Sequence, residues 1–167
     1  MIPVRIETAR LVLRKPVIGD LADIHAVLGN AQAMRYWAHP AHDSIDQSRD
    51  WLLAMMRPEP ASDDFLLEYQ GHVIGKAGCW RLPEVGFCLH PDQWGKGLAR
   101  EAMAAAMAHL FAHHPLDALT AEADPRNGAS IGLLRRLGFV ETHRAERTMQ
   151  WGTEWCDSVY FRCARPQ

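Results

Sequence analysis

The sequence predicts a mixed α/β (α+β) fold in which about four helices flank one central sheet. Apolar residues alternate with polar ones in some segments and recur every three to four positions in others, so both strands and helices occur. Short connections force hairpins between some strands, whereas helical and strand segments alternate in the second half. The sheet therefore combines antiparallel hairpins with β-α-β units.

The length of 167 residues is typical of one domain, and neither an internal repeat nor a long linker divides it. We expect a single domain over residues 1–167. A net charge of -2 lacks the concentrated basic surface of nucleic-acid binders. No apolar run approaches the roughly 18 residues that a membrane span requires. We therefore expect neither nucleic acid nor membrane as a partner.

The first residues do not resemble a signal peptide, because charged side chains from Arg5 to Arg14 interrupt the apolar residues. The four cysteines lie far apart without a C-x-x-C pair, which is typical of reduced thiols inside a cell. The expected location is cytoplasmic.

A first strand is expected within 4–14, where Leu11 and Leu13 set a period of two. A helix is expected over 20–28, because apolar residues recur there at spacings of three and four. Gly29 supplies a C-terminal stop for this helix.

A second helix is expected over 44–56. Ser44 and Gln47 have the spacing of a capping box at its start. The segment ends before Pro58 and Pro60, which cannot continue a helix.

Two strands are expected over 65–69 and 73–80, joined through Gln70-Gly71-His72. This connection is short enough to force a hairpin between them. The segment 85–90 continues the sheet.

The remaining segments alternate between helix and strand. We expect an alanine-rich helix over 97–113, a short strand over 118–123, a helix over 129–137 and further strand from Phe139 onward.

The stretch 87–100 predicts an anion site, because a strand ends and a helix opens across Gly95 and Gly97. Unpaired N–H groups of a first helical turn attract anions, and glycines let a diphosphate approach them. A P-loop is excluded because Lys96 is not followed by Ser or Thr, and a dinucleotide fingerprint fails at Arg100. The glycines alone would also suit a simple tight turn.

The turn before the long helix reads Trp94-Gly95-Lys96-Gly97-Leu98-Ala99. It resembles the R/Q-x-x-G-x-G/A signature of GNAT acetyltransferases, with Trp94 in place of the first Arg or Gln. A second block, Asn127-Gly128-Ala129-Ser130 followed by Leu137-Gly138-Phe139, resembles the N-x-x-S…L-G-F segment of the RimJ/RimL-like branch. The opening Thr8–Arg14 is similar to the first strand of that branch, so the resemblance spans most of the chain.

The resemblance implies the GNAT fold, with a central, mostly antiparallel mixed sheet of about seven strands and about four helices. It also implies an N-acetyltransferase that uses acetyl-CoA and transfers acetyl directly to a primary amine, without a covalent enzyme intermediate. The residues expected to hold the cofactor lie on the strand end, the turn and the second block: Phe87, Cys88, Leu89, Trp94, Gly95, Lys96, Gly97, Leu98, Ala99, Arg100, Asn127 and Ser130. Asn127 would otherwise be an ordinary turn residue.

Glu84 is the candidate general base, because GNAT enzymes often carry one at the start of this strand. Glu68 and Glu122 lie on neighbouring strands and are alternatives, and a solvated strand-end carboxylate is the other interpretation of Glu84. Many GNAT enzymes use a Tyr as general acid, but Leu134 occupies that position here. Ser130 matches the acid proposed in the RimL-like branch, although a helix-start hydroxyl would look the same.

The acceptor is expected to be an amine-bearing small molecule or a protein N-terminus. Trp37 and Trp80, together with Trp151, would form apolar walls around it, although core packing also explains such residues. The aromatic C-terminal segment would pack internally or pair strands across a homodimer.

No metal is expected. His109 and His113 share a helix face at a spacing of four, but no suitably spaced acidic or thiol partner accompanies them in the sequence. A cationic helix C-terminus explains them better. Because the usual acid at position 134 is missing, a non-catalytic acyl-CoA sensor or interaction module is the alternative function.

Overall fold

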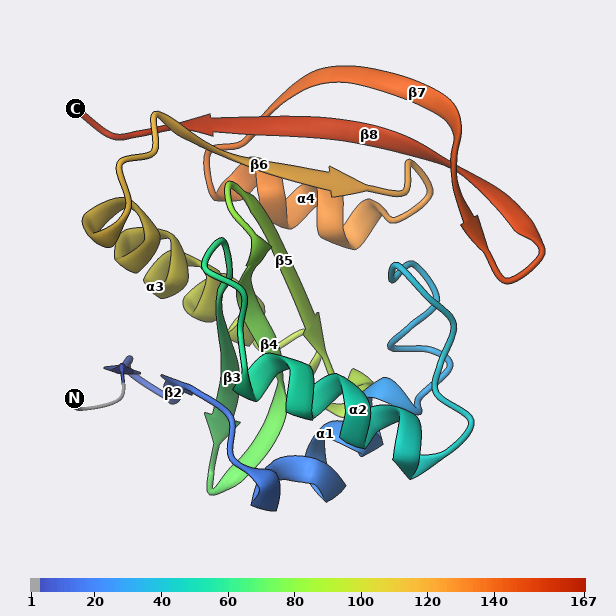
Figure 1. Ribbon diagram of the computed structural model, residues 1–167. Helices are drawn as coiled ribbons and strands as arrows, with labels where there is room; N and C mark the ends of the chain where they lie inside the picture. The colour runs from blue at the N-terminus through green and yellow to red at the C-terminus, as the bar shows by residue number, and fades with distance from the viewer. Residues whose placement is uncertain (1–3) are drawn as a thin grey trace.

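The computed structural model describes residues 4–167 and is built on one eight-stranded sheet with the order β1-β2-β3-β4-β5-β6-β8-β7 (Figure 1). All neighbouring strands are antiparallel except β5 and β6. The predicted mixed fold and its four α-helices are confirmed. In chain order the elements are β1 (Arg5–Glu7), β2 (Leu11–Arg14), η1 (Ile18–Asp20), α1 (Leu21–Leu28), α2 (Ile45–Met56), β3 (Asp63–Tyr69), β4 (His72–Arg81), β5 (Glu84–Leu89), η2 (Pro91–Gln93), α3 (Leu98–His113), β6 (Ala118–Ala123), α4 (Gly128–Arg136), β7 (Val140–Trp151) and β8 (Glu154–Ala164).

The N-terminal segment forms two strands rather than the single strand predicted over 4–14, because the chain reverses after Thr8. The Thr8 hydroxyl accepts a hydrogen bond from Leu11 N at 3.0 Å. The Glu101 carboxylate on α3 lies 2.6 Å from the same hydroxyl and accepts from Arg10 N at 2.9 Å. These contacts satisfy the polar groups of the turn and account for one strand more than expected.

Local signals fix the ends of the first two helices as predicted. Gly29 follows the last residue of α1, and its N–H donates to His25 O. At the start of α2, the side chain of Gln47 accepts a hydrogen bond from Ser44 N at 3.3 Å. This is the return contact of a capping box.

At β3 both faces of the sheet are buried, and successive residues of the strand point to opposite faces. On β3, Phe65 and Leu67 pack into the cluster that α3 covers, whereas Leu66 packs into the cluster formed with α1 and α2. Helix α3 contributes small residues, including Ala102 and Ala106, and so lies close to the strands. The central strands therefore lie between two packed layers.

Strands β5 and β6 pair at a single position, Glu84 with Thr120. Beyond it the two strands diverge, and Figure 1 shows their ends well separated. Strand β6 continues to pair with β8 along its whole length, from Ala118 to Ala123. The sheet is therefore split between the ends of β5 and β6, at Leu89 and Ala123.

The aromatic C-terminal segment pairs within the chain. Strand β8 lies between β6 and β7, so Tyr160 faces Glu122 on one side and His143 on the other. In the described part of the chain, no helix combines the length and apolar character needed to cross a membrane.

Candidate active site

The split between β5 and β6 opens into a cavity of about 730 Å³. Five segments line it: the ends of the two strands, the turn before α3, the start of α4 and the connection between α1 and α2. This volume lies in the usual range for a small-molecule site. Its position at the only parallel pair of the described sheet makes it the candidate active site.

The turn before α3 has the backbone that its glycines predict. Gly95 has φ of 75° and Gly97, at the helix N-cap, has φ of 76°, a left-handed conformation that favours glycine. A Cβ on Gly95 would meet no atom within 4 Å, so the space above the turn is open. The first N–H groups of α3 border the cavity and can receive an anion.

Side chains brace this turn from two sides. The indole of Trp94 donates to Leu89 O at 3.0 Å and so ties the turn to the end of β5. Arg10 donates to Lys96 O at 2.8 Å and also pairs with Glu101 at 2.9 Å. Trp94 therefore links the turn to β5, at the position where the GNAT signature has Arg or Gln.

Every residue expected to hold the cofactor lines the cavity except Lys96. The ammonium of Lys96 donates instead to Gln93 Oε1 at 2.9 Å. The sequence did not single out Arg126 and Arg136, which also line the cavity. Neither lies at a motif position, so only the folded chain reveals them.

Asn127 combines the two roles that the sequence left open. Its side-chain oxygen accepts from Ser130 N at 3.2 Å and so caps α4. Both residues also line the cavity. The capping bond uses only the oxygen of Asn127, and its NH₂ group keeps its capacity to donate.

The three candidate carboxylates occupy different surroundings. Glu68 is paired with Arg14 at 2.7 Å and does not line the cavity. Glu84 is exposed beside the β5–β6 pairing and also lies outside the lining, whereas Glu122 lines the cavity. The hydroxyl of Ser158 donates to Glu122. Partial desolvation and, secondly, the charge of Glu122 raise the pKa of Glu84.

Cys88 is buried at the end of β5, and its thiol lies 3.8 Å from Ala33 O. Burial raises the pKa of this thiol to about 12, although the charge of Lys76 acts in the opposite direction. A thiol in this state carries little of the thiolate needed for nucleophilic attack at neutral pH.

Of the three tryptophans expected at the acceptor site, only Trp37 lines the cavity, and the indole of Trp151 donates instead to Met34 O at 3.2 Å. Trp80 is half exposed and stacks on Trp51 with ring centroids 6.5 Å apart.

Tyr36, next to Trp37, was not expected, yet it lines the cavity close to the guanidinium of Arg35, 5.0 Å from its ring. The connection between α1 and α2 consists mostly of turns, so no periodic pattern in the sequence indicated which of its side chains would line the cavity.

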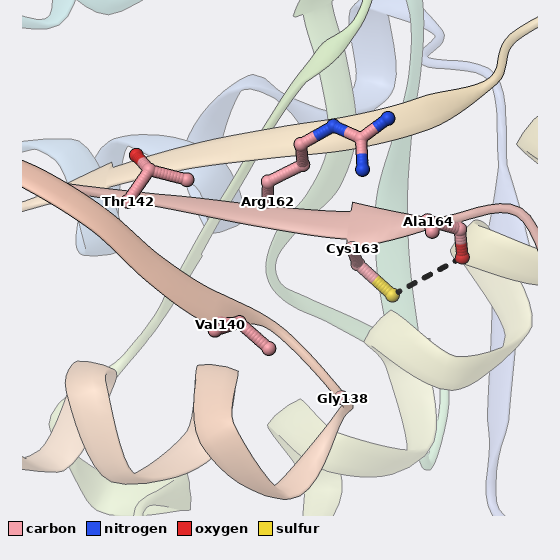
Figure 2. A pocket seen from close by; sticks show the side chains of 6 residues that line it. All are labelled: Gly138, Val140, Thr142, Arg162, Cys163 and Ala164. Atoms are coloured by element: carbon pink, nitrogen blue, oxygen red, sulfur yellow. Dashed lines mark hydrogen bonds between the residues drawn. The ribbon is translucent and has the colours of Figure 1, made fainter.

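A second hollow of about 430 Å³ lies over β7 and β8 (Figure 2). It is lined by Gly138, Val140, Thr142, Arg162, Cys163 and Ala164. The thiol of Cys163 lies 3.8 Å from Ala164 O. The hollow contains none of the predicted site residues and no carboxylate, so it does not compete with the cavity between β5 and β6.

Comparisons with known proteins agree with this geometry. The family model described as "Acetyltransferase (GNAT) domain" matches residues 10–140. The uncharacterized N-acetyltransferase YoaA of Bacillus subtilis is 28% identical over 171 residues, covering 96% of each chain. Spermidine N(1)-acetyltransferase of Escherichia coli is 30% identical over 129 residues, covering 72% of this chain and 67% of the relative.

Among solved structures, the fold is similar to that of RimL, a ribosomal-protein α-N-acetyltransferase, in complex with coenzyme A. The TM-score is 0.79 at 16% identity, and the match covers 96% of this chain and 98% of the other. At this identity the similarity concerns the fold alone.

Proposed function

The chain belongs to the GNAT acetyltransferase family, and from this membership we propose that it transfers acetyl from acetyl-CoA to a primary amine by direct attack in a ternary complex. The observation that carries the proposal is the cavity of about 730 Å³ between β5 and β6, which ends at the glycine turn of α3. The family consists of acetyl-CoA-dependent N-acetyltransferases. Beyond this membership, we propose the direct route of transfer and the primary amine as acceptor.

The chain's own groups suit acetyl-CoA along the whole cavity. The diphosphate would bind the first N–H groups of α3, with the positive charges of Arg100 and Arg136 nearby. The pantetheine chain would run along Phe87–Leu89, where β5 no longer pairs with β6. The amide NH₂ of Asn127, which also lines the cavity, would donate to it.

The amine must lose a proton before it attacks the thioester. We propose that the carboxylate pair of Glu84 and Glu122 receives this proton. Glu122 lines the cavity and is the better positioned of the two, while Glu84 has the raised pKa that suits a base. Ser130 is the proposed proton donor to the leaving thiolate, because it lines the same cavity, and its hydroxyl would regain a proton from the ammonium nitrogen of the tetrahedral intermediate.

The surroundings of Cys88 support direct transfer. A covalent route would require a thiolate, and the pKa of this buried thiol is raised to about 12. We therefore expect Cys88→Ala to retain acetyl transfer, and an acetylated Cys88 on the reaction path would contradict the proposal.

The acceptor would enter from the side of the α1–α2 connection, between Tyr36, Trp37 and Glu122. Curated relatives include enzymes named for spermidine, and structural neighbours include one that acetylates ribosomal proteins. We propose a primary amine of either a polyamine or a protein N-terminus, the latter in keeping with the RimJ/RimL-like motifs.

The test is thiol release from acetyl-CoA with a panel of amines: spermidine, spermine, free amino acids and peptides with free N-termini. Turnover with one class identifies the acceptor and supports the enzyme. Binding of acetyl-CoA without turnover on any amine would favour the acyl-CoA sensor instead.

The base is identified by comparing Glu84→Gln and Glu122→Gln across pH. Loss of a positioned base should lower kcat about 100-fold near neutral pH, with partial recovery as pH approaches the pKa of the amine. Glu59→Gln, at an exposed loop position, is the matched control. Unchanged pH profiles in both variants would remove this pair from the mechanism.

A further inference from the structure

Three potential metal ligands converge outside the acetyl-transfer cavity. Asp63 begins β3, His109 lies near the end of α3 and His114 directly follows that helix. The Nε2 atoms of His109 and His114 lie 2.9 Å and 2.7 Å from the same oxygen of Asp63, Oδ2. All three ligand atoms lie within 4.8 Å of one another.

This arrangement corrects the sequence-based interpretation of the histidines. An acidic partner was not expected, but Asp63 supplies one from 46 residues away. Burial lowers the pKa of His109, although Asp63 opposes the effect, and this direction does not favour the cationic role expected at the helix end. His113 stays outside the cluster, stacked on His109 at 4.2 Å.

The cluster is held in place by its neighbours. The side chains of His109 and Asp63 are only 7% and 12% exposed, and the ring of His109 meets the ring of Phe65 edge-on at 5.1 Å. His114 is more accessible, with 24% of its side chain exposed. The ring nitrogens thus converge on one carboxylate oxygen and remain reachable from the side of His114.

We propose that Asp63, His109 and His114 form a binding site for a divalent transition-metal ion of the zinc type. Two imidazoles and one carboxylate are a ligand set that Zn²⁺ accepts, with water completing the coordination. Tetrahedral Zn²⁺ with bonds of about 2.0–2.1 Å needs ligand atoms about 3.3 Å apart. The observed separations of 2.9 Å and 2.7 Å require a movement of about half an ångström, which His114 can make because it lies beyond the helix.

The charge of Lys15 acts against such an ion. Its ammonium donates to the other oxygen of Asp63, Oδ1, at 2.8 Å and to Asp64 O at 3.0 Å. Asp63 would therefore ligate the ion through Oδ2 alone. Replacing Lys15 by Met should tighten metal binding, which would not follow if the cluster were only a network of hydrogen bonds.

The site would stabilise the fold rather than take part in acetyl transfer. His109 lies eleven positions after Leu98, which is beside the glycine turn, and this corresponds to about 16 Å along the helix. An ion here would join the start of β3 to the end of α3. The inference therefore does not depend on the proposed function.

The experiment measures Zn²⁺ binding to the EDTA-treated full chain by calorimetry, with Co²⁺ as a spectroscopic probe of nitrogen and oxygen ligands. We expect one ion per chain and a rise in Tm of about 5 to 11 °C at 100 times Kd. His114→Ala should weaken binding at least tenfold, whereas the matched control His113→Ala should leave it unchanged. Acetyl transfer by the EDTA-treated protein should keep its rate.

Two further variants keep the test decisive if His114→Ala folds poorly. Asp63→Asn should also weaken Zn²⁺ binding at least tenfold, and Lys15→Met should strengthen it. The proposal is overturned if the wild type binds neither Zn²⁺ nor Co²⁺ with one-to-one stoichiometry. Equal affinity in the wild type and in folded His114→Ala would also overturn it.

Discussion

Asn127→Asp separates the helix cap from the proposed cofactor contact, because the two roles use different atoms of one side chain. A carboxylate oxygen can accept from Ser130 N as the amide oxygen does at 3.2 Å. Its negative charge at a helix N-terminus stabilises by about 0.3–1 kcal/mol. The free energy of unfolding should thus stay equal or rise slightly, while the NH₂ donor is lost.

The comparison variant is Asn127→Ala, which loses both roles. Removal of the cap should cost about 1 kcal/mol, which lowers Tm by roughly 2–4 °C for a chain of this size. In both variants acetyl-CoA should bind about fivefold more weakly, since one neutral hydrogen bond contributes about 1 kcal/mol.

Thermal unfolding without ligand and calorimetric titration with acetyl-CoA give the two quantities independently. The reasoning is refuted if Asn127→Asp binds acetyl-CoA with the affinity of the wild type. It is also refuted if the Asp variant loses as much stability as the Ala variant.

Other perturbations test the packing and the charges. A Cβ on Gly75 would lie 1.9 Å from Cys88 O, so Gly75→Ala should lower the free energy of unfolding in urea by about 3 kcal/mol or more. Lys76→Met should lower the free energy of unfolding by about 3–5 kcal/mol. The ammonium of Lys76 lies 2.5 Å from the buried carboxylate of Asp64, and the substitution leaves this carboxylate without its charge partner. Although burial opposes ionisation, hydrogen bonds from Lys15 and the two histidines lower the pKa of Asp63 from 3.8 to about 2. The ionised carboxylate of Asp63 therefore contributes roughly 2 kcal/mol to the free energy of unfolding above pH 4. Measured in EDTA, the stability difference between wild type and Asp63→Asn should shrink as pH falls from 4 to 2.

Each of these predictions has a control. A Cβ on Gly19 would meet nothing within 4 Å, so Gly19→Ala should keep the stability of the wild type. Adding Asp64→Leu to Lys76→Met should recover much of the loss, because no unpaired buried charge remains. A stability difference that stays constant between pH 4 and pH 2 would contradict the reasoning on Asp63.

Most elements could be predicted because their ends are encoded locally. Gly29 ends α1, Gln47 reaches back to the start of α2, and Gln70-Gly71 turns the hairpin between β3 and β4. The break in the first strand could not be predicted, because the turn at Thr8 is held by Glu101, 93 residues away.

The candidate site divides in the same way. The glycine turn and Asn127 were predictable because a helix start imposes its requirements on adjacent residues. Trp80 was expected in the site, yet it stacks on Trp51 on the outside of the sheet. The distinction between Glu84 and Glu122 depends on where two strands diverge, which no local pattern encodes.

The sequence by itself therefore determined the class of fold, the family and the glycine turn before α3, since these depend on periodicity, capping and short motifs. The tertiary structure alone decided which carboxylate lines the cavity and which aromatic side chains surround it. It also brought Asp63 to His109 and His114, from opposite ends of the β3-to-α3 segment. The physical reason is that such contacts arise when whole elements pack on one another, and packing joins residues whose separation along the chain carries no signal.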